Sequence, residues 1–167
     1  FTSDSIDKTI EAALALAQVA DGDEHRQLPD PKPVSDEDLA IYDGAMLSVD
    51  PDDKVSFQKR VEAAALAVDE RVKVATMCQY FDVVGQVYLS NTRGFSDTYQ
   101  STMAGSFIMA MAEEDDERAM GFGMGVGRSM TTMDADKIGK DAGTQAVNLL
   151  GGEQVPTQRA SVVYHPR

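Results

Sequence analysis

The chain has 167 residues and a mass of 18.0 kDa, which fits one domain with a buried core. With 43% hydrophobic and 26% charged residues its composition is that of a globular protein, and it has neither a secretion signal nor an apolar run near the roughly 20 residues of a membrane span. Its formal charge of −13 argues against direct nucleic-acid binding, because that binding relies on Lys and Arg. We therefore expect a soluble, cytoplasmic protein with no membrane or nucleic-acid partner.

Residues 1–20 predict a helix. Ser3, Asp4 or Ser5 can cap its first turn. Its apolar positions recur at helical spacing, so we expect them to form one buried stripe: Ile6, Ile10, Ala13, Leu14 and Ala17.

Residues 21–53 predict an acidic, proline-rich loop with one short turn near residues 38–42. The stretch from Asp21 to Asp53 holds eleven acids, two bases and four of the six prolines. It is either a solvated linker or a docking segment for a basic partner.

Residues 54–167 predict the main body of the same domain. A helix is expected to start near Asp52 or Asp53, where acids favour the amino end of the helix dipole, and to end at residues 69–70. One face of this helix carries Phe57, Val61, Ala64 and Val68.

From Arg71 the pattern changes to a period of two, which predicts a strand. One face of that strand carries Val72, Val74, Thr76, Cys78 and Tyr80. Cys78 is the one cysteine, so an internal disulfide and a CxxC site are both excluded, and we interpret it as a buried strand thiol.

Three further strands are expected after the first. Asp82 marks a turn into residues 85–91, residues 91–94 turn into a long third strand, and residues 113–117 turn back into a glycine-rich strand. Asp134 can cap a last helix that is stopped by Gly151 and Gly152. The positions of this helix expected to face inward are Ile138, Ala142, Ala146 and Leu149.

A final strand at residues 161–164 completes the predicted fold. Short polar turns between consecutive strands indicate an antiparallel meander. The fold class is therefore α+β, a two-layer sandwich in which helices cover mostly one face of the sheet.

Glycine recurs at every second residue of the fourth strand, at Gly121, Gly123, Gly125 and Gly127. One face of that strand then has no side chains, so another element must lie close to it. Gly139 and Gly143 give the last helix a small-residue face that suits such packing. The alternative is that the bare face contacts an extended peptide or a partner subunit.

Two other patterns leave alternatives open. The acidic run at residues 113–117 could suggest calcium, but it lacks the ligand spacing of a calcium loop and is better interpreted as a charged hairpin tip. A methionine stripe is either adaptable core or a surface for promiscuous peptide contact. Its members are Met103, Met109, Met111, Met120, Met124, Met130 and Met133.

The chain contains an ordered set of short motifs: Thr2-Ser3-Asp4, Leu28-Pro29-Asp30-Pro31, and residues 87–95, 121–128, 136–142, 149–158 and 162–166. Taken together they resemble the PmbA/TldD family, also called modulators of DNA gyrase, and more closely its PmbA (TldE) branch. Phe1 is not an initiator Met, and members carry further segments, so we expect an internal piece of the amino-terminal domain of a longer chain.

The resemblance implies a non-catalytic subunit that pairs with a TldD-like zinc metallopeptidase in a hetero-oligomer and helps enclose unfolded or flexible peptides for proteolysis. Asn91, Arg93 and Phe95 match a family turn, with Thr92 in place of the usual Ser, and together with the four glycines they are the candidate peptide or subunit contacts.

TldD-like subunits carry a His-Glu-x-x-x-His zinc motif, whereas this chain has no His-Glu pair and its histidines are His25 and His165. We therefore assign the chain no catalytic residue, metal ligand or cofactor, and zinc is expected in the partner. Two alternatives remain. One is a non-enzymatic interaction module, and the other is a fragment of a TldD-like peptidase whose catalytic half lies elsewhere.

Overall fold

The structure is a computed structural model that describes residues 2–28, 30–32, 35 and 37–164. Backbone contacts divide the chain into two compact units. The N-terminal unit comprises Phe1–Ser35 and Tyr88–Asp97, and the main unit comprises Asp36–Val87 and Thr98–Arg167.

The N-terminal unit contains helix α1, Ser3–Val19. Thr2 caps it one residue before the earliest expected position, because Thr2 and Ser5 form a reciprocal capping box. The prediction of a buried apolar stripe is wrong: no residue of α1 is buried, since no described residue of this unit covers that stripe.

The acidic segment is largely irregular, as expected, and Pro29 lies outside the described residues. A short 3₁₀ helix, η1 (Gly44–Ser48), forms where only loop was expected, because Asp43 caps it and Met46 is buried beneath it. Near residues 38–42, Asp38 accepts a hydrogen bond from the Ala40 N–H, but no regular turn forms.

Helix α2 spans Pro51–Leu66, with Asp50 as its cap and Asp52 and Asp53 in its first turn. It ends before the expected residues 69–70. Phe57 and Val61 are buried as expected, and Ala65 is buried beside them. Ala64 and Val68 are half-buried and face Gly139 and Gly143 of the last helix.

The sheet has three strands in the order β1-β2-β3: Val72–Ser90, Ser96–Glu114 and Glu117–Gly127. The prediction of a turn at Asp82 is wrong, because β1 runs through this position without interruption. The Asp82 carboxylate forms an ion pair with the Lys54 ammonium of α2, so a charged residue is accommodated within the strand. The meander therefore has fewer and longer strands than expected.

The alternation predicted for the start of β1 is also incorrect. Val72, Ala75, Cys78 and Tyr80 are the side chains that are buried or pack against the core, whereas Val74 and Thr76 are exposed. Positions three apart cannot share one face of a regular pleat, so the strand is irregular between Val72 and Cys78.

After β3 come a 3₁₀ turn, η2 (Met130–Thr132), and helix α3, Ala135–Asn148. Asp134 caps α3 as predicted, and Ile138, Ala142 and Ala146 are buried. The prediction that Leu149 faces inward is wrong, because it follows the last helical turn and is exposed.

The final strand expected at residues 161–164 is not formed. These residues have no regular structure and are exposed, because no strand of the described chain pairs with them. His165 and Pro166 lie outside the described residues.

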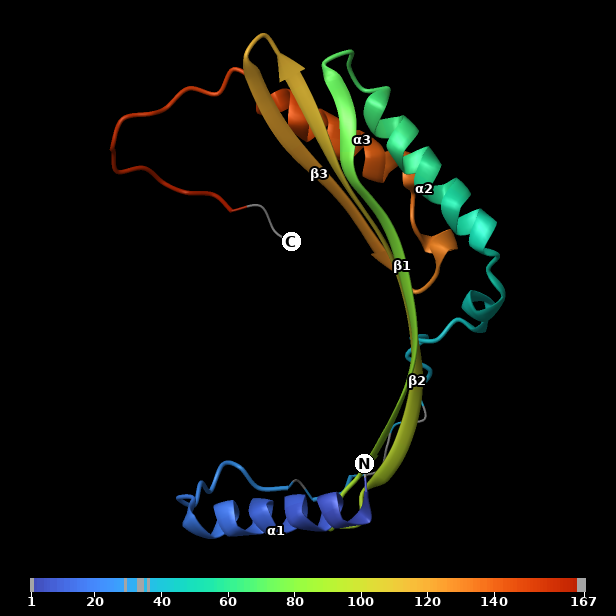
Figure 1. Cartoon of the computed structure of the whole chain (residues 1–167), viewed down its shortest axis with the longest axis vertical. Helices are drawn as coiled ribbons and strands as arrows, with labels where there is room; N and C mark the ends of the chain where they lie inside the picture. The colour runs from blue at the N-terminus through green and yellow to red at the C-terminus, as the bar shows by residue number, and fades with distance from the viewer. Residues whose placement is uncertain (1, 29, 33–34, 36, 165–167) are drawn as a thin grey trace. The chain divides into compact units, whose positions relative to one another are not determined.

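In the main unit α3 packs against β3, and α2 packs against α3, on the same side of the sheet (Figure 1). The predicted two-layer α+β class is therefore confirmed. Gly139 and Gly143 allow the two helices to approach closely. A Cβ on Gly139 would lie 2.2 Å from the Val61 carbonyl oxygen, and one on Gly143 would lie 2.6 Å from the Ala65 carbonyl oxygen. The small-residue face of α3 thus contacts α2 and not the sheet.

Candidate functional site

Asn91 organises the turn between β1 and β2 in the N-terminal unit. Its side-chain oxygen accepts hydrogen bonds from the N–H groups of Arg93 (2.9 Å) and Phe95 (3.2 Å). Gly94 takes a positive φ of 90°, which favours glycine. The predicted turn is confirmed, and Asn91 holds it together from within.

Arg93 projects from the same turn toward the acidic segment of its own unit. Its guanidinium lies 2.8 Å from the Asp30 carboxylate. Both side chains are well exposed, so the pair contributes little stability, and the cation stays accessible.

The four glycines of β3 belong to the main unit, so the seven candidate contact residues are divided between the two units. A Cβ on Gly121 would lie 2.2 Å from the Ala142 carbonyl oxygen, and one on Gly123 would lie 2.0 Å from that of Ile138. At Gly125 the Ile138 side chain fills the space, and at Gly127 it is the Thr132 hydroxyl.

The glycine face of β3 is therefore occupied by α3 and the turn before it. This is the helix-on-strand packing that the glycine pattern favoured. α3 also binds the β3 backbone directly, because the Gln145 side-chain oxygen accepts the Phe122 N–H at 2.7 Å.

The opposite face of the sheet is open, and we call it the outer face. It is formed by alternate residues of β2 and β3 that are paired across the strands, among them Phe107 with Met124, Met109 with Phe122, and Met111 with Met120. The remaining members are Met103 and Val126, and Met103, Met120, Phe122, Met124 and Val126 are 40–61% exposed.

Phe81 of β1 adds an aromatic ring to this face. A Cβ on Gly105 would lie 2.1 Å from the tip of that ring, so the ring lies directly over the Gly105 backbone. Sequence reasoning missed this contact. A glycine within a long apolar strand was the signal that could have revealed it.

A polar network joins α2 to the inner side of the sheet. The Gln58 amide donates to the Cys78 sulfur at 3.0 Å and accepts from the Ser106 hydroxyl at 2.9 Å. Burial raises the pKa of the Cys78 thiol, so the group stays protonated near neutral pH. This arrangement is structural and does not favour a nucleophile.

A second polar cluster contains Lys54, Asp82 and Tyr80. The Lys54 ammonium lies 5.9 Å from the centre of the Tyr80 ring, and Phe57 packs edge-on against the same ring at 6.2 Å. Burial, and then the nearby charge of Asp82, raise the pKa of Tyr80. The Lys54–Asp82 ion pair attaches the start of α2 to β1.

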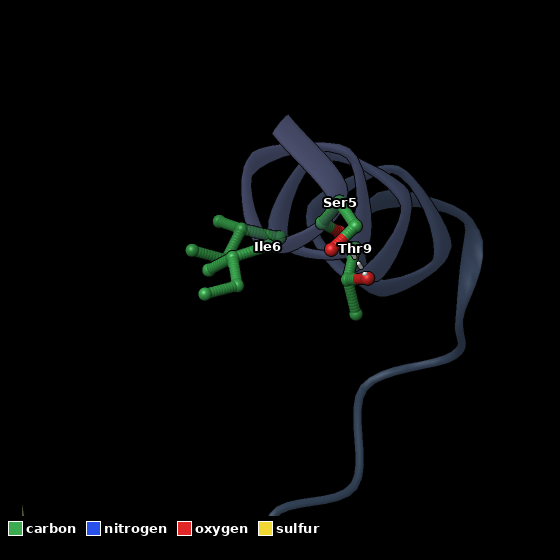
Figure 2. Close-up of a pocket in the computed structure, with 4 residues that line it drawn as sticks. Ser5, Ile6 and Thr9 are labelled. Carbon is green, nitrogen blue, oxygen red and sulfur yellow. Dashed lines mark hydrogen bonds between the residues drawn. The ribbon is translucent and has the colours of Figure 1, made fainter. Parts of the chain in front are cut away.

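A pocket on α1 is lined by Ser5, Ile6, Thr9 and Ile10 (Figure 2). The Thr9 hydroxyl donates to the Ser5 carbonyl oxygen at 2.7 Å, so the polar part of the pocket is satisfied within the helix. All four residues come from two turns of one exposed helix, and the pocket is a shallow notch without converging side chains.

Among residues 2–28, 30–32, 35 and 37–164, no three His, Cys, Asp or Glu side chains are grouped so that they could hold a metal ion. Within the same residues, none of the helices has both the length and the hydropathy required to cross a bilayer. The outer face is a feature of the main unit that packing among its described residues does not account for.

The sequence profile of the PmbA/TldA metallopeptidase central domain matches residues 46–150. Metalloprotease PmbA of Escherichia coli O157:H7 is 25% identical over 168 residues, which cover 96% of this chain and 36% of that protein. The chain therefore spans about a third of the length of this curated relative.

Solved structures of related proteins also match this chain. A putative modulator of DNA gyrase from Bacteroides thetaiotaomicron VPI-5482 has a TM-score of 0.77 and 25% identity, covering 92% of this chain and 36% of that one. Another putative modulator of DNA gyrase, from Thermotoga maritima MSB8, has a TM-score of 0.71 and 25% identity, covering 90% of this chain and 33% of that one. TldE from Thermococcus kodakarensis shares the fold, with a TM-score of 0.67 and 15% identity. The match covers 88% of this chain and 33% of that one.

Proposed function

Because this chain belongs to the PmbA/TldD metallopeptidase family, we propose that it is part of a PmbA (TldE)-like subunit that binds flexible peptides for a TldD-like zinc peptidase. The subunit itself is non-catalytic. In this arrangement the partner supplies the zinc and its bound water, and this chain supplies a surface on which an extended polypeptide is held.

The observation that carries the proposal is the open outer face. In an antiparallel sheet covered on one side only, the uncovered side normally carries polar residues. Here the uncovered side carries methionine, phenylalanine and valine. Methionine adapts its shape to different neighbours, which suits contact with peptides of varied sequence.

The assignment to the non-catalytic branch rests on sequence. Thr2-Ser3-Asp4 and Leu28-Pro29-Asp30-Pro31 resemble motifs of that branch, and Metalloprotease PmbA is 25% identical to this chain. Asn91, Arg93 and Phe95 are proposed as further contacts with peptide or partner, since they present an ordered turn with an accessible cation.

The test is reconstitution with a TldD-like zinc peptidase. The chain and the peptidase are mixed, their association is measured by size-exclusion chromatography, and cleavage of an unfolded protein is followed with and without a chelator. The proposal expects a complex, faster cleavage in the presence of the chain, and loss of all cleavage with the chelator. If the chain neither associates with the peptidase nor changes its cleavage rate, the proposal is wrong and the interaction-module alternative is favoured.

A further inference from the structure

Resting on the proposed function, we propose that the outer face is the docking surface for one chemical class of peptide. This class is an extended segment with apolar side chains at alternate positions and Lys or Arg at one end. The apolar side chains would contact the outer face, and the basic end would lie at the turn between β2 and β3.

The first argument is an inversion of residue size across the sheet. Apart from Ile108, the side of β2 and β3 that faces α3 is lined by small residues, such as Ala110, Ala112 and Gly123, which are buried. The outer face carries the large apolar side chains of the same two strands. Large apolar groups stabilise a fold when they leave water, so their concentration on the open side indicates a surface that is covered in use.

The second argument is the charge at one end of this face. The outer row ends at Glu113 and Arg118, which form an ion pair at 3.0 Å, and Glu114 pairs with Arg71 at 2.9 Å. The remaining acids of the turn are Asp115, Asp116 and Glu117, which are exposed and make no ion pair with any described residue. The Glu117 carboxylate accepts a hydrogen bond from the Gly151 N–H at 2.8 Å.

The turn therefore adds an uncompensated negative end to an uncharged apolar surface. Arg128 follows the other end of β3, so the two ends of the face differ in charge. A peptide with a cationic end would be complementary to this arrangement in one orientation.

The third argument separates this occupant from a second copy of the chain. Each copy carries a formal charge of −13, so two copies brought face to face would repel one another. A basic, apolar polypeptide meets the same surface with attraction from its charge and with burial of its side chains. The observations thus favour a foreign segment of opposite charge.

The test uses three fluorescein-labelled peptides of 11 residues, the length of β3. The first alternates Leu and Ser and ends in three Lys, the second replaces the Lys with Glu, and the third replaces the Leu with Gly. Binding to the chain is measured by fluorescence anisotropy at low salt and at about 0.5 M NaCl. The first peptide is expected to bind at least about tenfold more tightly than either of the others at low salt. Its advantage over the Glu peptide should shrink at high salt.

Two variants locate the binding surface. Met124→Asp places a charge at the most exposed methionine of the outer face, which is 61% exposed, and should weaken binding of the first peptide by about tenfold or more. The matched control is Leu47→Asp, because Leu47 is 69% exposed but belongs to η1. The Asp43 N–H, just before η1, donates a hydrogen bond to the hydroxyl of Thr102, a buried residue on the helix side of β2. The control should bind as the unchanged chain does.

A second pair of variants tests the charge. Asp115→Asn with Asp116→Asn removes two charges from the turn, and Asn tolerates the positive φ of 51° at position 115. The control removes the same charge from α1 with Asp7→Asn and Glu11→Gln. The turn variant should lose most of the preference for Lys over Glu, whereas the α1 variant should retain it.

The results distinguish this inference from the proposed function. Equal binding of all three peptides, or equal effects of Met124→Asp and Leu47→Asp, would overturn the inference while association with the zinc peptidase could still be observed. A chain that elutes as a dimer and binds none of the peptides would overturn it in favour of a second copy. Failure to associate with the peptidase, with peptide preference intact, would instead remove the proposed function.

Discussion

Gly123 of β3 lies directly against Ile138 of α3, so closely that a Cβ on the glycine would stand 2.0 Å from the isoleucine carbonyl oxygen. The obstacle is backbone, which cannot rotate away as a side chain could. This contact sets the distance between α3 and the sheet. It also fixes which side of β3 is covered and which side is the outer face.

Gly123→Ala should therefore destabilise the fold. The added methyl forces α3 away from β3, and overpacking of this kind costs about 3 kcal/mol. The free energy of unfolding is measured by urea denaturation. Gly22→Ala is the control, because a Cβ at Gly22 meets nothing within 4 Å, and it should change stability by less than about 0.5 kcal/mol. Equal effects of the two substitutions would contradict this account of the packing.

Gln58 provides a second test of how the helices are attached to the sheet. Gln58→Leu leaves the buried Ser106 hydroxyl without its partner, which should cost about 1–3 kcal/mol. Combining it with Ser106→Ala removes the unsatisfied group and should recover part of that loss. A thermal-denaturation cycle of the two single variants and the double variant measures the coupling. Strictly additive effects would show that the two side chains do not interact.

Asp69 should carry a measurable acid dependence. Its hydrogen bonds to the Arg71 side chain and backbone lower its pKa from 3.8 to about 2. A lowered pKa in the folded state means that the stabilisation is present above the unfolded pKa and is lost as pH falls through about 2. NMR titration of the Asp69 carboxyl carbon should show the low pKa, and Arg71→Gln should return it toward the ordinary value. An unchanged midpoint in Arg71→Gln would contradict the assignment.

Cys78 should react slowly with thiol reagents in the folded state. Burial raises its pKa, so little thiolate is present near neutral pH, and the sulfur is engaged with Gln58. Modification by a disulfide reagent is followed by absorbance with and without denaturant. A rate in the native chain equal to the denatured rate would show that the thiol is open to solvent.

The local parts of this fold could be predicted from sequence because their causes are local. Asp134 as a helix cap, the turn at Asn91 and the close helix contact implied by the β3 glycines all follow from the chemistry of a few neighbouring residues. The order of strands, polar turns and helices indicated the fold class, and the sheet topology and the similar structures confirm it.

The predictions that were wrong concern positions whose structure depends on residues far away in the sequence. Asp82 resembles a turn residue until Lys54, which lies far from it in sequence, pairs with it inside a strand. The stripe on α1 is amphipathic by pattern, yet no described residue of its unit covers it. Whether the methionines were core or surface could not be read from their period alone, because both faces of β2 and β3 lack charged residues over most of their length.

The most direct test of the central claim is the initial rate at which a TldD-like zinc peptidase cleaves an unfolded protein in the presence of this chain or of its Met124→Asp variant. The account predicts that the unchanged chain accelerates cleavage and that the variant, although folded and bound to the peptidase, accelerates it much less. Equal acceleration by both would contradict a role for the outer face in holding the peptide.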